Sequence, residues 1–204
     1  MKKFMCVVLP VLFLLAGLGL YGQKIKSGSF ASLKSESVVN IQYDWSKMRV
    51  GKFANEQDYI NDGISDRNKK KPGSGDEWAA KWNSDKTSRF QPMFEKELNE
   101  TLKGCNLSGK EGASDAKYTF IVRTTFLEQG FQSGVGPSKP ASINMTLDLV
   151  ETANPGSILG HIVYDKVPSV NMMGYDIDTG TRIQSCYDRA GGNIGKLICK
   201  SLAK

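Results

Sequence analysis

The chain has 204 residues, of which 40% are hydrophobic and 24% charged, and its formal net charge is +6. A chain of this length can bury one substantial core, and once a leader is removed it is too short for two comfortable domains. Its single histidine and its four cysteines, none in a Cys-x-x-Cys pair, exclude a cage of several histidines and the usual zinc or redox spacing. We therefore expect one domain and no cofactor.

The first 22 residues have the layout of a secretory signal peptide. Lys2 and Lys3 precede an almost wholly apolar stretch at 7–20, small residues follow, and charge begins just after Gln23. The apolar stretch is shorter than the ~20 residues that a spanning helix needs, and it contains Pro10. An uncleaved anchor is the alternative. We expect cleavage near Gln23, no transmembrane span afterwards, and an exported protein that is periplasmic or extracellular, with outer-membrane association as a further option.

Three cysteines remain after such a cleavage, namely Cys105, Cys186 and Cys199. Cys186 and Cys199 fall in one predicted helix, roughly 20 Å apart along its axis, which is too far for a disulfide. Any disulfide within the chain therefore involves Cys105. Three buried thiols are the alternative.

The first half of the domain combines one clear strand with weaker patterns. Residues 23–36 are rich in Ser, Lys and Gly and predict a flexible lead-in to a single domain at 37–204. Residues 37–43 are β-branched and alternate, which predicts a strand. A short helix is expected at 54–61, ended by Gly63. Residues 62–76 have no apolar periodicity and predict a mobile loop.

A helical pattern follows from Asp76 to Gly104. Pro92 is expected at a kink or in the first turn of a second helix, because it cannot donate a helical hydrogen bond. Trp78, Ala79 and Trp82 begin the helical pattern. For the apolar stripe that follows, a core face is favoured over a partner surface, and it comprises Phe90, Phe94, Leu98 and Leu102.

The second half is rich in strands. Alternating residues predict strands at 118–127, 143–149 and 158–164, the last two forming a hairpin with its turn at 154–157. An amphipathic helix is expected from about Arg182, with Gly191 and Gly192 allowing a close approach to the sheet. This order predicts an α+β fold, a two-layer sandwich of a mostly antiparallel four-stranded sheet with helices packed on one face.

Two sequence features suggest sites without defining one. Asp176 and Asp178 resemble the start of a calcium loop, but the closing glutamate is missing, so a polar turn near a helix start is favoured and a weak metal site is the alternative. The apolar loop 167–175 carries Met172, Met173 and Tyr175, adaptable side chains that suit partner binding or cap the core.

Other chemistry finds little support in the sequence. The dense basic run at 69–71 stands alone in a predicted loop, which does not favour nucleic-acid binding. His161 has no nucleophile placed beside it by a motif, so a sheet histidine is favoured over a catalytic one.

The segment at 39–48, Val-Asn-Ile-Gln-Tyr-Asp-Trp-Ser-Lys-Met, together with the element order that follows it, resembles a group of exported proteins of unknown function from Bacteroidetes. More distantly the chain is similar to periplasmic and outer-membrane lipoprotein-like domains with an α/β sandwich. The resemblance implies no catalytic residues. We expect a non-enzymatic, envelope-associated interaction module with an envelope protein as partner, and the oligomeric state stays open. The alternative is a hydrolase that acts on envelope or host polymers through carboxylates.

Overall fold

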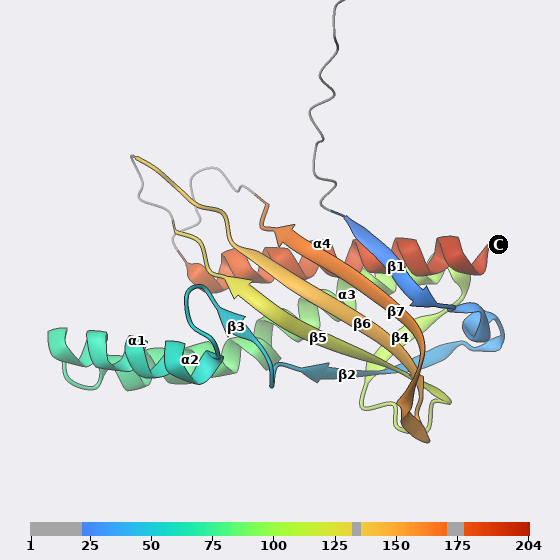
Figure 1. Ribbon diagram of the computed structural model, residues 1–204, viewed down its shortest axis with the longest axis horizontal. Coiled ribbons are helices and arrows are strands. Elements are labelled where there is room, and N and C mark those ends of the chain that lie inside the picture. The colour runs from blue at the N-terminus through green and yellow to red at the C-terminus, as the bar shows by residue number, and fades with distance from the viewer. Residues whose placement is uncertain (1–21, 132–135, 171–177) are drawn as a thin grey trace, which may run out of the picture.

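A computed structural model of the chain describes residues 22–131, 136–170 and 178–204. A mixed sheet forms one layer, and the helices α3 and α4 lie behind it in the view of Figure 1. The strands are β1 (Gln23–Gly28), β2 (Val38–Asp44), β3 (Arg49–Val50), β4 (Ser108–Glu111), β5 (Tyr118–Glu128), β6 (Ser142–Glu151) and β7 (Asn154–Pro168). The α-helices are α1 (Glu56–Lys70), α2 (Ser74–Asp85), α3 (Gln91–Leu102) and α4 (Thr179–Leu202).

The α+β class is confirmed, whereas the expected four-stranded sheet is wrong. The sheet has seven strands in the order β1-β7-β6-β5-β2-β4, with β3 paired to β5. Strands β1, β7, β6 and β5 pair antiparallel, and β2 runs parallel to both β5 and β4. The added strands β1, β3 and β4 are short or polar, so they carry little hydrophobic alternation of their own.

The predicted hairpin of β6 and β7 is confirmed. Leu147 is registered against Ile162, and the β6 residues of the inner face are fully buried. The turn lies at Thr152 and Ala153, so Asn154 already pairs with Glu151 in the ladder. The expected turn at 154–157 is therefore wrong by two residues, because the ladder continues through that segment.

The segment 23–36, expected to be a flexible lead-in, is ordered by the sheet. Its first half is β1, which pairs with β7, and its second half holds a 3-10 turn at Ala31–Ser35. Phe30 and Leu33 are each only 1% exposed, and the Phe30 ring lies 6.4 Å from that of Phe120. Two well-buried side chains are enough to anchor a segment whose overall composition is polar.

A helical hairpin of α1 and α2 replaces the predicted mobile loop at 62–76, and it projects beyond one end of the sheet (Figure 1). Gly63 lies inside α1 and does not end a helix, and it lets Trp78 approach closely, since a Cβ atom there would stand 2.4 Å from the Trp78 ring. The turn between the helices uses Gly73 at a φ of +84°, where glycine is favoured. The basic run of Lys69 and Lys70 occupies the last turn of α1, where cations interact favourably with the helix dipole.

Helix α4 packs closely against α3. A Cβ atom on Gly191 would lie 2.4 Å from the Phe94 carbonyl oxygen, so this glycine allows a close contact with α3. The expectation that it would allow a close approach to the sheet is wrong. A disulfide between Cys105 and Cys199 joins the ends of the two helices. The prediction that any disulfide would involve Cys105 is confirmed. The thiol of Cys186 is buried, and it donates to the Arg182 carbonyl oxygen at 3.5 Å.

None of the helices in the described part of the chain is both long enough and apolar enough to cross a membrane. The predicted signal peptide falls outside the described residues, except for its last residue, Gly22.

Candidate ligand-binding site

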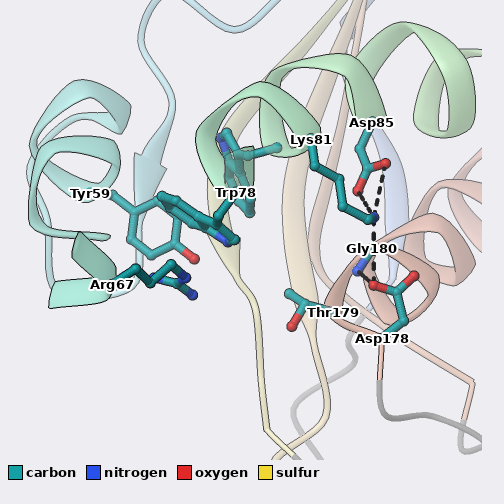
Figure 2. A pocket seen from close by; sticks show the side chains of 9 residues that line it. Tyr59, Arg67, Trp78, Lys81, Asp85, Asp178, Thr179 and Gly180 are labelled. Carbon is teal, nitrogen blue, oxygen red and sulfur yellow. Dashed lines mark hydrogen bonds and ion pairs between the residues drawn. The ribbon is translucent and has the colours of Figure 1, made fainter. Parts of the chain in front are cut away.

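A pocket of about 220 Å³ opens between the α1–α2 hairpin and the first turn of α4. Tyr59, Trp78 and Arg67 lie together on one side of it, and Lys81, Asp85 and Asp178 lie on the other (Figure 2). At ~30 Å³ for each water of liquid volume, the space holds roughly seven waters, which corresponds to a small ligand. The lining residues are Tyr59, Arg67, Trp78, Lys81, Trp82, Asp85, Asp178, Thr179 and Gly180.

Aromatic rings form the wall that the hairpin contributes. The Tyr59 ring lies 5.5 Å from that of Trp78 and 4.8 Å from that of Trp82. The Trp82 indole nitrogen donates a hydrogen bond of 2.7 Å to the carboxylate of Glu56, which also accepts from Lys86 at 2.7 Å. These contacts join aromatic rings from both helices into one wall of the pocket.

Arg67 supplies a cation to this wall. Its guanidinium carbon lies 4.1 Å from the centre of the Trp78 ring, a favourable cation–π geometry, and its Nη1 donates to the carbonyl oxygen of Gly63 at 3.1 Å. Within the described residues, no carboxylate forms an ion pair with Arg67, and no hydrogen bond engages the Tyr59 hydroxyl. Burial raises the pKa of Tyr59, partly offset by Arg67, so its hydroxyl keeps its proton and remains a donor. This wall therefore presents unused hydrogen-bond donors.

The opposite wall is a closed ion-pair network. Asp178 accepts from Arg89 at 2.6 Å and lies 3.7 Å from the Lys81 ammonium. Asp85 lies 3.2 Å from Lys81 and 3.6 Å from Arg89. Both carboxylates are thus shared by the same two cations. Gly180 gives this network room, because a Cβ atom there would stand 2.2 Å from Arg89 Nη1.

The network fixes the ionisation of Asp178. Desolvation acts to raise the pKa of this carboxyl, but hydrogen bonds from Arg89, Thr181 and the Gly180 amide outweigh it and lower the pKa to about 2. The same side chain caps α4 by accepting from the Gly180 N–H. Asp178 is therefore a charged helix cap at the pocket wall.

Of the candidate binding and metal residues predicted from the sequence, the described residues place Asp178 at this site. Asp178 lines the pocket, while Met172, Met173, Tyr175 and Asp176 lie outside the described residues. Across residues 22–131, 136–170 and 178–204, no three His, Cys, Asp or Glu side chains are grouped as a metal ion would require. The weak metal site at Asp176 and Asp178 stays a prediction.

His161 lies on the sheet away from this pocket. Its Nδ1 contacts the buried carboxylate of Asp148, which also pairs with Arg123, and Arg123 reaches Asp44 at 3.2 Å. The histidine therefore belongs to a cross-strand polar network of the sheet.

Sequence reasoning missed Tyr59 and Arg67. The sequence pattern predicts a short helix at Tyr59 and a loop at Arg67, although Tyr59, Gly63 and Arg67 recur every four residues, as on one face of a helix. Trp78 and Trp82 repeat the same spacing in α2. Considered together, these two spacings indicate a helical hairpin with aromatic and cationic contacts between its two helices.

Comparisons with known proteins add a distant likeness of fold. The sequence matches no family model and no curated protein. Among solved structures, a PelC dodecamer from Paraburkholderia phytofirmans is 11% identical with a TM-score of 0.39, covering 84% of this chain and 96% of that one. A neuraminyllactose-binding hemagglutinin homolog from Helicobacter pylori is 13% identical with a TM-score of 0.34, covering 89% of this chain and 90% of that one. Likenesses this distant assign no residue a role.

Proposed function

We propose that this protein is an exported binding module, and that the pocket between the α1–α2 hairpin and α4 takes a small anionic ligand. The observation that carries the proposal is the state of Arg67. Its guanidinium is fixed on Trp78 at 4.1 Å, yet no carboxylate of the described residues neutralises it. A planar guanidinium held in this way suits the two oxygens of a carboxylate or phosphate.

The contrast between the two walls sets the orientation of the ligand. Lys81 and Arg89 already share the carboxylates of Asp85 and Asp178, so that wall needs no further charge. The anionic group would therefore lie by Arg67 and the Tyr59 hydroxyl, with the body of the ligand against the aromatic rings. Pockets of this kind combine an apolar lining with a few fixed polar groups.

Export is proposed on two grounds. The first 22 residues have the layout of a signal peptide. The disulfide between Cys105 and Cys199 supports an oxidising compartment, because structural disulfides are rare in the cytosol. A periplasmic or extracellular location is consistent with both features, and mass measurement of the exported protein tests the cleavage near Gln23.

Ligand binding can be tested through the tryptophans. Trp78 and Trp82 line the pocket, so their emission should change when glucuronate or inorganic phosphate is titrated into the protein, and glucose should have a much weaker effect. Arg67→Gln should weaken binding of the anionic probe at least tenfold, since charge-assisted hydrogen bonds contribute about 1.5–3 kcal/mol.

Arg49→Gln is the matched control. Arg49 also lies over an aromatic ring, 5.8 Å from the centre of Phe126, but it does not line the pocket. Its replacement should leave binding unchanged. Equal affinity for glucose and glucuronate, or no binding of either anion, would contradict the proposed ligand chemistry.

The segment with Met172, Met173 and Tyr175 is proposed as a second contact surface, for an envelope protein. Val167 and Pro168, which were expected in the same loop, belong to β7, and Val167 is fully buried. Adaptable Met and Tyr side chains suit partner binding, which supports the proposal. Replacing Met172, Met173 and Tyr175 together with serine should abolish capture of that partner while the melting temperature changes by only a few degrees. A large loss of stability would show instead that these side chains cap the core.

A further inference from the structure

The outer edge of β2 is covered along only part of its length. Strand β4 pairs with β2 from Val38 to Ile41, where Ile41 is registered against Glu111. From Gln42 to Asp44, β2 pairs with β5 on its inner side, and no other strand of the described residues reaches its outer side. This margin of the sheet is visible in Figure 1, with β4 beside the start of β2. An uncovered edge offers backbone N–H and C=O groups to an extended chain.

Two hollows lie along this edge and meet at Glu111. One has a volume of about 410 Å³ and is lined by Asn40, Gln42, Tyr43 and Gly112, among others. The other has a volume of about 430 Å³ and is lined by residues of α3, including Gln91 and Glu95, together with Lys110 and Glu111. The edge therefore runs between two concave surfaces large enough for side chains.

Asn40, which lines the first hollow, carries a buried acceptor without a partner among the described residues. The Thr152 hydroxyl donates to the Ala116 carbonyl at 2.6 Å, so the Thr119 hydroxyl must donate to Thr152 at 2.9 Å. The Asn40 amide nitrogen then donates to Thr119 at 3.1 Å, which fixes the amide orientation. Asn40 is only 3% exposed, and its Oδ1 has no hydrogen-bond partner among the described residues. Such a buried acceptor is costly unless a donor reaches it.

Two carboxylates stand at the second hollow. The Glu111 N–H donates to the Glu95 carboxylate at 3.2 Å, which holds the two acidic residues together. Burial raises the pKa of the Glu111 carboxyl, and the neighbouring charge of Glu95 raises it further. Lys96 pairs with Glu97. Lys110 is registered against Asn40, so its strand position belongs to the opposite face from Glu111, although part of its side chain also lines this hollow.

We infer that an extended basic peptide adds to the outer edge of β2 at Gln42–Asp44 and directs a lysine or arginine to Glu95 and Glu111. Successive side chains of such a strand point to opposite faces. One would face α3 and its carboxylates, and the next would face the hollow that Asn40 lines. The backbone edge supplies affinity and the two hollows supply specificity, as in other cases of strand addition.

The test uses a fluorescent octapeptide of alternating lysine and threonine, titrated into the full protein and followed by anisotropy. We expect saturable binding that is at least tenfold weaker for an octapeptide of alternating glutamate and threonine. A lysine–threonine peptide with every backbone nitrogen methylated has no N–H group to donate to the strand edge, and it should also bind at least tenfold more weakly. Because this test changes the peptide and leaves the protein intact, loss of folding cannot explain a negative result.

Variants of the protein locate the site. Glu111→Gln and Glu95→Gln should each weaken binding several-fold, whereas Glu100→Gln should not, since Glu100 on the same helix is exposed and paired with Lys103. No binding of the lysine peptide, equal binding of the methylated or acidic peptide, or unchanged binding by both glutamate variants would overturn the inference. Neither carboxylate lines the pocket at Arg67, so the result is independent of the proposed ligand site.

Discussion

Gly191 of α4 faces Phe94 of α3 so closely that a Cβ atom on the glycine would stand 2.4 Å from the Phe94 carbonyl oxygen and 3.0 Å from the Leu98 nitrogen. Backbone atoms cannot rotate away as a flexible side chain can. The spacing of the two helices, and with it the core between them, therefore depends on this residue.

Gly191→Ala should consequently destabilise the protein by about 1–3 kcal/mol, as other over-packed core substitutions do. Gly192→Ala is the internal control, because nothing lies within 4 Å of a Cβ atom at that position. There alanine should stabilise the helix by up to ~1 kcal/mol. Urea unfolding of both variants measures the difference, and equal effects would mean that α3 and α4 are not in this close contact.

Removing the disulfide should weaken the fold without changing the pocket. Cys105 and Cys199 are separated by 94 residues, and closure of a loop of this order contributes about 2–4 kcal/mol in typical proteins. The double replacement of Cys105 and Cys199 with serine should lower stability by that amount. Intact mass after alkylation in denaturant checks the pairing, since the oxidised mature protein should expose one thiol, that of Cys186.

Asp178→Asn should destabilise the protein in a pH-dependent way. The folded-state pKa of Asp178, about 2, lies below its ordinary value of 3.8, so the carboxylate stabilises the fold above pH 4 and loses this effect as the pH falls towards 2. Because the side chain is 46% exposed, we expect a loss of about 1 kcal/mol at pH 7.

The stability difference between Asp178→Asn and the unaltered protein should therefore narrow between pH 4 and pH 2. Asp66→Asn serves as the control, since Asp66 forms only an exposed pair with Lys69 and should show little effect at any pH. A difference for Asp178→Asn that stayed constant down to pH 2 would refute the role assigned to its charge.

The two faces of β6 should respond differently to a charge. Leu147 is fully buried against the helices, so Leu147→Asp places an unpaired carboxylate in the core and should cost more than 3 kcal/mol. Thr146 points to the opposite face and is partly exposed, so Thr146→Asp should cost less than about 1 kcal/mol. Similar melting temperatures for the two variants would indicate a register shifted by one residue.

Some elements were predictable because their own residues carry the signal. β5, β6 and β7 alternate apolar and polar side chains, and the stripe of α4 repeats every three or four residues. The place of Cys105 in a disulfide followed from helix geometry, since Cys186 and Cys199 are too far apart on one helix. In these cases the local pattern and the tertiary contacts agree.

The sequence by itself determined the α+β class, the β6–β7 hairpin and the terminal helix, because the buried side chains of these elements recur with the period of a strand or a helix. Only the tertiary structure decided the order of β1 and β4 at the sheet edges, since these polar strands gain their stability from partners distant in sequence. The same holds for the α1–α2 hairpin. Its stability comes from the contact of Gly63 with Trp78 and the stacking of Arg67 on that ring, which no periodicity within either helix alone reveals.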